Sequence, residues 1–148
     1  MIQKLKIVFL FTLIFTVSQS CKKGCDYPKE NTITGDIIAD ASVLGFNTGG
    51  VKSVHYTDDP NNLLQVSFDK GYTYIPIDFS KYTAMNFPVS VGCNTYFEKN
   101  VTINNAASKV TYTLVVNSCP DCEDQYRQDN WVLVPKFSTN FQVVYERK

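Results

Sequence analysis

Short apolar and β-branched segments recur along the chain from Thr32 onward, and turn-forming residues such as Gly49-Gly50 and Asn104-Asn105 separate them. Regularly spaced short strands of this kind are typical of an antiparallel sandwich or barrel. The predicted strands are Ile33–Asp40, Val51–Tyr56, Leu63–Phe68, Tyr72–Phe79, Phe87–Val91, Tyr96–Ile103, Lys109–Val116, Trp131–Val134 and Phe141–Glu146.

The clearest alternation lies in the segment that begins at Lys109. Val110, Tyr112 and Leu114 are apolar, whereas the intervening Thr111 and Thr113 carry hydroxyl groups. Because successive side chains of a strand point to opposite faces, this strand is predicted to bury one face and expose the other.

Two segments depart from the strand pattern. Pro76 cannot donate a backbone hydrogen bond, so its strand is expected at a sheet edge or at a bulge. Residues Pro120 to Asp129 are predicted to form a turn or a short helix.

No other segment has helical periodicity, so residues 32–148 are predicted as an all-β domain. We expect a small antiparallel β-sandwich, immunoglobulin-like in architecture, with a small closed β-barrel as the alternative.

The first twenty residues have the three parts of a secretory signal. Lys4 and Lys6 precede an apolar run from Ile7 to Val17, and small residues follow at Ser18 and Ser20. The apolar run of eleven residues is too short to cross a hydrocarbon core of roughly 30 Å as a helix. Residues 1–20 are therefore predicted to be a signal peptide.

The residue that follows this signal is a cysteine, in the stretch Val17-Ser18-Gln19-Ser20-Cys21, and Lys22-Lys23 come next. The stretch resembles the signal of bacterial lipoproteins of the Bacteroidota type, with Ser18 at the position that the usual lipobox gives to Leu. The resemblance implies that Cys21 is lipidated and that residues 21–31 form a short tether. It also implies a chain anchored to the outer membrane or at the cell surface. Ordinary cleavage after Ser20, which would leave a soluble secreted or periplasmic protein, is the alternative.

The chain has five cysteines, an odd number that leaves one over if the rest form disulfides in an oxidising compartment. Use of Cys21 for lipid leaves Cys25, Cys93, Cys119 and Cys122, which are predicted to form two disulfides. Three connectivities are open.

The same cysteines fit two other kinds of site less well. Cys119-Pro120-Asp121-Cys122 follows a predicted strand and resembles the redox motif of thioredoxin-like proteins, which would imply thiol–disulfide exchange. That fold needs long crossover helices, and the chain has no segment with such periodicity. A four-cysteine zinc site prefers two Cys-x-x-Cys knuckles, and only one is present. Disulfide staples are therefore the favoured interpretation.

Charge and motif content exclude several functions. Basic and acidic residues number fourteen each, without the basic stripe that nucleic-acid binding requires. The acidic stretches at Asp58-Asp59 and Asp121 to Asp124 lack the spacing of a calcium loop. His55 is the single histidine, on a predicted strand face shared with Ser53, and no nucleophile elbow accompanies it. The prediction is therefore a protein without catalytic residues, metal or cofactor.

Aromatic residues are dense in the middle of the chain. Most are expected to pack in the core, whereas Tyr72, Tyr74 and Tyr96 are candidates for a face that binds a protein or carbohydrate partner. The predicted function is a membrane-anchored envelope lipoprotein with a non-enzymatic binding or structural β domain. The alternative is a thiol–disulfide oxidoreductase that uses Cys119 and Cys122.

Overall fold

The computed structural model describes residues 30–41, 51–56, 65–67, 73–92, 95–118 and 125–148, and within them it contains strands and no helix. The predicted all-β class is confirmed. The strands are β1 Thr32–Gly35, β2 Ala39–Ala41, β3 Ser53–His55, β4 Gln65–Val66, β5 Ile75–Pro76, β6 Tyr82–Asn86, β7 Val89–Gly92, β8 Thr95–Asn104, β9 Lys109–Ser118, β10 Gln125–Gln128, β11 Trp131–Pro135 and β12 Gln142–Arg147.

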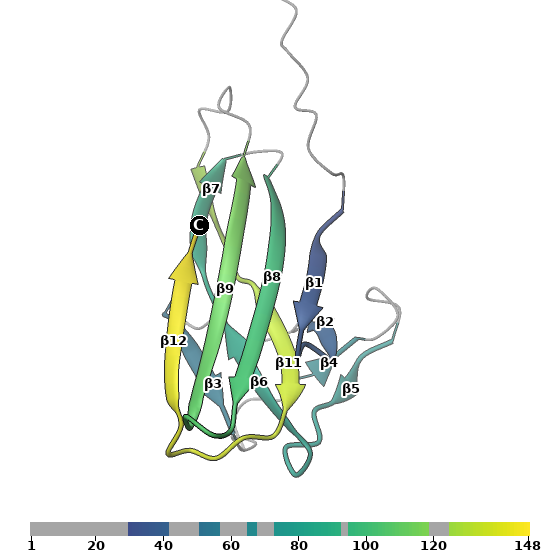
Figure 1. Cartoon of the computed structure of the whole chain (residues 1–148). Coiled ribbons are helices and arrows are strands. Elements are labelled where there is room, and N and C mark those ends of the chain that lie inside the picture. The colour runs from purple at the N-terminus through teal and green to yellow at the C-terminus, as the bar shows by residue number, and fades with distance from the viewer. Residues whose placement is uncertain (1–29, 42–50, 57–64, 68–72, 93–94, 119–124) are drawn as a thin grey trace, which may run out of the picture.

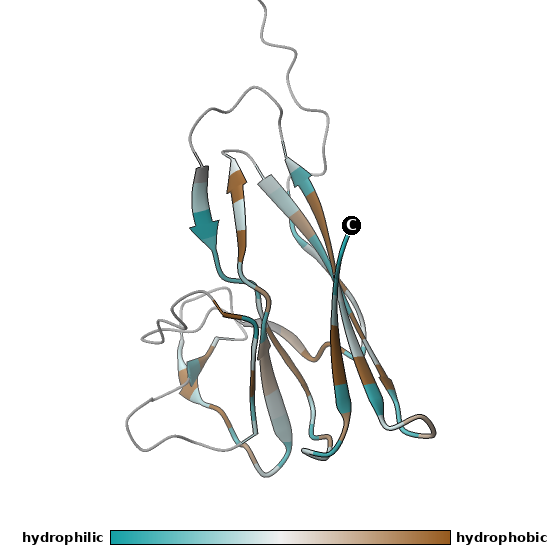
Figure 2. Ribbon diagram, turned by 90° about the vertical axis from the view of Figure 1, so that its left-hand side faces the viewer, coloured by the Kyte–Doolittle hydropathy of each residue, from teal (hydrophilic) through white to brown (hydrophobic). Residues whose placement is uncertain are grey.

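Two four-stranded sheets form the layers of a β-sandwich (Figures 1 and 2). The first sheet has the strand order β1-β8-β9-β12, and the second has the order β2-β11-β6-β3. Two-stranded ribbons, β7–β10 and β4–β5, accompany them. None of these sheets closes on itself, so the sandwich prediction holds over the barrel.

The two edge strands of the first sheet are parallel to their neighbours, which the antiparallel prediction did not include. β1 runs parallel to β8, and β12 runs parallel to β9, whereas every other strand pair in the described part of the chain is antiparallel. A parallel neighbour cannot be reached through a tight hairpin, because the chain must first return to the starting end. Both edge strands are accordingly far in sequence from the strands that they join.

The strand predicted at Ile33–Asp40 is in fact two strands in different sheets. Gly35 ends β1 with a φ of 73°, and an added Cβ there would lie 2.2 Å from the carbonyl oxygen of Val101. Only glycine tolerates both conditions. Asp36 then donates its backbone N–H to Val101 O at 2.7 Å and accepts the N–H of Ile103 on its side chain at 2.6 Å. These bonds anchor the crossing from the first sheet to the second.

Two further strands contradict the sequence-based interpretation. β6 was not predicted, although it lies at the centre of the second sheet between β11 and β3. Its residues Thr83 to Asn86 are buried on both faces, so the strand lacks the alternation of apolar and polar residues that marks a half-buried strand. β10 occupies part of the segment predicted as a turn or short helix, and it pairs with β7. The edge position expected for Pro76 is confirmed, because β5 pairs only with β4 among the described strands.

The second sheet is buried on both faces. Its inner face packs against the first sheet through a main core, and its outer face carries a second core with residues from the β4–β5 region. The main core contains Met85, Phe87, Val89, Val91, Phe97, Val101, Val110, Tyr112, Leu114, Val132, Val134 and Phe137. The second core contains Ala39, Val66, Ile77, Ala84, Trp131 and Leu133.

The strand pairing of the second sheet is interrupted between β6 and β7, and hydrogen bonds from buried residues bridge the interruption. β6 and β7 face β11 and β10 in one continuous register, and the break falls at Phe87-Pro88, where Pro88 has no N–H to donate. Asn130 accepts the N–H of Phe87 on its carbonyl oxygen at 3.1 Å and donates its side-chain amide to Phe87 O at 3.2 Å. Tyr112 of the first sheet donates its hydroxyl to the same Asn130 carbonyl at 3.0 Å. The bond joins the two sheets inside the core.

Thr83 offers a test of the core's polar content. Its hydroxyl oxygen is fully buried and has no hydrogen-bond partner among the described residues. A buried hydroxyl without a partner costs about 1 to 3 kcal/mol. We therefore expect Thr83→Val, which is isosteric, to raise the free energy of unfolding by about 1 kcal/mol.

Urea unfolding at constant m-value measures the effect. Thr83→Ser is the matched control, because it keeps the hydroxyl, loses the methyl group and should destabilise the protein. A loss of stability in Thr83→Val would contradict the prediction and indicate that the hydroxyl has a partner.

Candidate binding surface

All five cysteines, and therefore all of the cysteine predictions, fall on residues that the structure does not describe. Cys21, Cys25, Cys93, Cys119 and Cys122 all lie outside the described ranges, as does Tyr72. Lipidation at Cys21, the two disulfides and the redox alternative stay predictions.

The two remaining tyrosines of the predicted binding face are described and are not brought together. Tyr96 lies in β8 on the outer side of the first sheet, opposite the core residue Phe97. Tyr74 directly precedes β5, in the region that covers the outer side of the second sheet. Both side chains are half-buried. Tyr96 therefore belongs to the first sheet, whereas Tyr74 adjoins the β4–β5 ribbon, and the two do not share one sheet face.

His55 lies in β3 on the side shared with Ser53, as the alternation predicted. Its Nε2 is 3.2 Å from the hydroxyl oxygen of Ser53, and its ring centroid is 5.4 Å from that of Trp131. Ser53 is on a regular strand rather than on the strained turn that presents a nucleophile. The arrangement packs His55 at the rim of the second core and suits a structural role.

Sequence reasoning missed an aromatic cluster that joins the edges of the two sheets. We call it the Tyr145 seam, and it consists of Lys52, Ser53, Phe87, Tyr112 and Tyr145. Tyr145 of β12 donates its hydroxyl to the carbonyl oxygen of Ser53 in β3 at 2.8 Å. Phe87 meets the rings of Tyr145 and Tyr112 edge-on, at centroid distances of 5.2 and 5.6 Å.

A lysine covers the seam from the solvent side. The Lys52 ammonium lies 4.5 Å from the centroid of Phe87 and 5.5 Å from that of Tyr145. A cation over an aromatic face is attracted by the ring quadrupole. Lys52 therefore shields two core rings while its charge faces water.

The seam favours a neutral phenol. Burial, and secondarily the charge of Tyr56, raises the pKa of Tyr145 well above its usual value. The hydroxyl therefore stays protonated near neutral pH and keeps donating to Ser53 O. A phenol held in this state serves as a hydrogen-bond donor at neutral pH.

The raised pKa of Tyr145 predicts a loss of stability at high pH. Below about pH 10 the phenol is neutral in both states, so its contribution is fully present. Above that pH the unfolded chain releases the proton and the folded chain keeps it, so stability falls as the pH rises. Urea titrations between pH 8 and 11 should show a shallower decline in Tyr145→Phe than in the unchanged protein. Identical slopes would contradict the assignment. Tyr126→Phe, at an exposed tyrosine, is the control.

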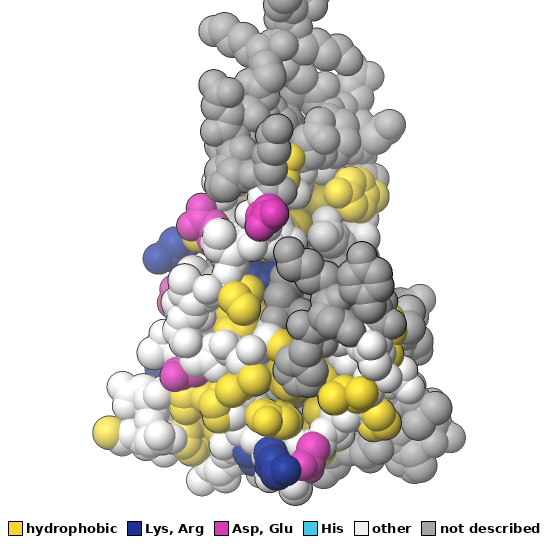
Figure 3. Space-filling view, turned by 90° about the vertical axis from the view of Figure 1, so that its right-hand side faces the viewer, with side chains coloured by type: hydrophobic (Ala, Val, Ile, Leu, Met, Phe, Trp, Pro, Cys, Tyr) yellow, Lys and Arg dark blue, Asp and Glu magenta, His cyan; other side chains and the backbone are white. Residues whose placement is uncertain are grey.

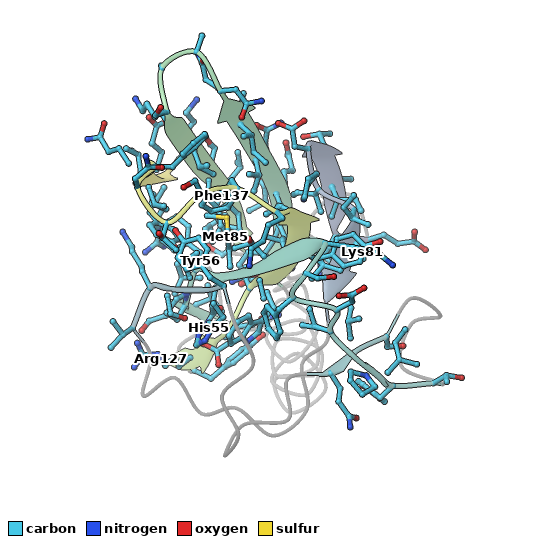
Figure 4. All side chains as sticks on the ribbon, turned by 90° about the horizontal axis from the view of Figure 1, so that it is seen from below. His55, Tyr56, Lys81, Met85, Arg127 and Phe137 are labelled. Carbon is cyan, nitrogen blue, oxygen red and sulfur yellow. The ribbon has the colours of Figure 1, made fainter. Side chains whose placement is uncertain are left out.

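A second aromatic group lies where β11 leaves the second sheet. Lys136 donates from its ammonium to the carbonyl oxygens of Tyr56 and Phe79, the latter at 2.8 Å. The rings of Tyr56 and Phe137 meet edge-on at 5.3 Å, and Figure 4 shows the two side chains close together. Lys136 thus joins the residue that follows β3 to the connection between β5 and β6.

Apolar side chains are exposed on the side of the molecule formed by β1, β2 and β5 (Figure 3). Ile33, Ile38 and Ile75 are 40, 47 and 45 % exposed. Asp36 and Asp78 are exposed close to them in the chain. Figure 3 shows apolar side chains gathered over the lower part of this side, with acidic and basic side chains around them, and Asp78 is paired with Lys81 at 3.1 Å.

Among the described residues, no three His, Cys, Asp or Glu side chains gather as a metal site. Nor does that part of the chain contain a helix with the length and apolar character of a membrane span. Comparison with known proteins found no match to a protein-family model, a curated protein or a solved structure.

Proposed function

We propose that the protein is a lipid-anchored envelope protein whose β-sandwich binds a partner without catalysing a reaction. The observation that carries the proposal is Cys21, placed directly after the small residues that end the signal segment. Cleavage before Cys21 makes it the first residue of the mature chain, and attached acyl chains add about 0.8 kcal/mol per buried methylene. Two or more such chains hold a small domain firmly on a membrane.

The character of the domain supports a binding or structural role. Three of its polar side chains bond to the backbone of the domain itself: Tyr145 and Tyr112 donate to backbone carbonyls, and Lys136 donates to the carbonyls of Tyr56 and Phe79. Rigid sheets of this kind present loops and edges in fixed positions. A protein or a carbohydrate is the partner that we expect.

The thiol–disulfide alternative ranks second. A redox Cys-x-x-Cys motif uses the N-terminus of a following helix to lower the thiol pKa. In this chain the next described residues after Cys122 begin a strand, β10, at Gln125. An insulin-reduction assay on the mature domain, compared with Cys119→Ala, tests the alternative directly.

The anchor is tested by blocking the lipoprotein signal peptidase in a bacterial host that expresses the full chain. We expect a larger precursor to accumulate, and without the block we expect a mature N-terminus whose mass includes acyl chains on Cys21. Cys21→Ser should escape acylation, whereas the control Cys25→Ser should be acylated normally. Normal maturation under the block would contradict the proposal.

A further inference from the structure

We propose that the outer edge of β1, the edge that faces away from β8, binds an extended segment of a partner protein as an additional strand of the first sheet. This segment has apolar side chains on the inner face of the sheet and basic side chains on the outer face. The inference deepens the binding role proposed above, because it names the surface and the class of partner. It does not depend on the lipid anchor.

The outer edge of β1 has no strand beside it in the described part of the chain. Asp36, which follows β1, donates its backbone N–H to Val101 O in β8. Every second residue of a strand bonds to the same neighbour, so Thr32 and Thr34 also face β8, and Ile33 points its N–H and C=O outward. All four residues of β1 are exposed. Backbone groups in this arrangement are a template for an added strand.

The other edge strands of the two large sheets have features that discourage pairing, and β1 lacks them. β12 contains the charged residues Glu146 and Arg147, and β2 contains Asp40. The bond from the Tyr145 hydroxyl to Ser53 O ties the edge strands β12 and β3 together and closes that side of the sandwich. Charges on an edge strand oppose pairing with another chain. The sequence of β1, Thr-Ile-Thr-Gly, has neither a charge nor a proline.

Apolar side chains lie beside the outer edge of β1. By its register with β8, Ile33 points to the inner face of the first sheet, and it is exposed there. Ile38, in the crossing from β1 to β2, is exposed on the same side of the molecule (Figure 3). The charges of Asp78 and Lys81 on this side are paired with each other. Because side chains alternate along a strand, an added strand covers these isoleucines with every second residue.

The charges around the edge determine which side chains the partner needs on the outer face. Glu98 of β8 and Asp36 at the end of β1 are both exposed, whereas Lys99 is buried, with 4 % exposed. Glu30 precedes β1, and its neighbour in the sequence, Lys29, offsets its charge and lies outside the described residues. The two remaining carboxylates favour basic residues on the neighbouring strand.

A second copy of the chain fits this edge less well than a partner of that kind. Two antiparallel β1 strands centred on Ile33 would place Glu30 of each copy opposite Asp36 of the other. Like charges directly opposite each other are destabilising. The charge pattern therefore favours a different protein as the partner.

The test titrates the purified full chain with two labelled synthetic peptides. The basic peptide is Val-Lys-Val-Thr-Val-Lys-Val, and the acidic peptide has glutamate in place of both lysines. Fluorescence anisotropy measures affinity, and amide hydrogen exchange followed by NMR measures protection of the Ile33 N–H. The variant is Ile33→Lys, which adds a charge at an exposed position of β1. Val144→Lys, at a half-buried position of the edge strand β12, is the matched control.

We expect the basic peptide to bind saturably and to slow the exchange of the Ile33 N–H. Ile33→Lys should weaken this binding at least about tenfold, and Val144→Lys should leave it unchanged. The acidic peptide should bind at least about tenfold more weakly than the basic one, and added salt should reduce the difference.

Absence of protection at Ile33 in the unchanged protein overturns the inference, as do equal binding of the two peptides and equal losses in the two variants. A dimer that sedimentation detects and that Ile33→Lys dissociates also overturns it, because the edge then belongs to a second copy. Mass spectrometry of Cys21 reports separately on the anchor. An acylated protein that binds neither peptide leaves the anchor intact, and a protein without lipid that binds the basic peptide leaves the strand site intact.

Discussion

Replacement of Phe87 by alanine is expected to lower the free energy of unfolding by about 3 to 5 kcal/mol, the range for removal of a buried aromatic ring. Phe87 is 2 % exposed and supports both the main core and the Tyr145 seam. Its removal deletes the edge-on contacts with Tyr112 and Tyr145 and leaves Lys52 without its nearer ring. A domain of ordinary stability has 5 to 15 kcal/mol in total, by the usual approximate range, so the variant should be barely folded at 37 °C.

Thermal and urea unfolding of Phe87→Ala and Phe87→Leu separate the contributions. Phe87→Leu keeps most of the buried volume, so we expect it to cost about 1 to 2 kcal/mol. The backbone bond from Phe87 N to Asn130 O is available to both variants. Equal losses in the two would contradict the account, because they would place the effect in the aromatic contacts rather than in the cavity.

Loss of the two predicted disulfides is expected to have an effect of similar size. The chain-entropy model gives about 3 to 4 kcal/mol for a bond that closes a loop of 26 positions, the separation of Cys93 and Cys119. The measurement is thermal unfolding of the mature domain with and without a reductant. We expect reduction to lower the melting temperature strongly.

The described residues that flank these cysteines favour two of the three connectivities. Cys93 directly follows Gly92, and Cys119 directly follows Ser118, whose strand partner Thr95 is bonded to Gly92 O. Consecutive Cα atoms are 3.8 Å apart, and a disulfide needs Cα atoms within about 7 Å. We therefore expect Cys93 to pair with Cys119 or Cys122, and the other to pair with Cys25.

Mass mapping of the unreduced protein checks this pairing. A Cys93→Ser variant should leave a free thiol at Cys119 or Cys122 and retain the bond from Cys25. A bond between Cys119 and Cys122 would contradict the expectation and revive the redox alternative. Four free thiols in protein from the oxidising compartment would refute the disulfides altogether.

The sequence could predict the strands in which buried and exposed side chains alternate with a period of two residues. Val110, Tyr112 and Leu114 were assigned to one face, and the structure buries all three in the main core. β6 could not be found in this way, because Thr83 and Asn86 are buried beside Ala84 and Met85. The β10 segment lacks apolar character and is a strand because β7 pairs with it. Tertiary pairing decided the structure in both places.

The candidate site was less accessible to sequence reasoning than the fold. The dense aromatics suggest one tyrosine face, yet Tyr96 belongs to the first sheet and Tyr74 adjoins the β4–β5 ribbon. The Tyr145 seam joins Lys52 of the loop before β3, Phe87 after β6 and Tyr145 of β12. Its members come from both sheets, with Tyr145 and Ser53 on the edge strands β12 and β3, and no local pattern reveals which edges meet across a sandwich.

If the chain is exported as proposed, its parallel edge strands impose an order on folding. Thr34 of β1 bonds to Asn100 of β8, which is 66 positions later in the chain. A polypeptide that crosses a membrane from its N-terminus delivers β1 long before its partner. β8 and β9 form a local hairpin with ten paired residues in each strand, and contacts between nearby residues form fastest. On that proposed route, β1 is the first described strand to emerge and one of the last to be paired, and until then its backbone groups have no strand partner.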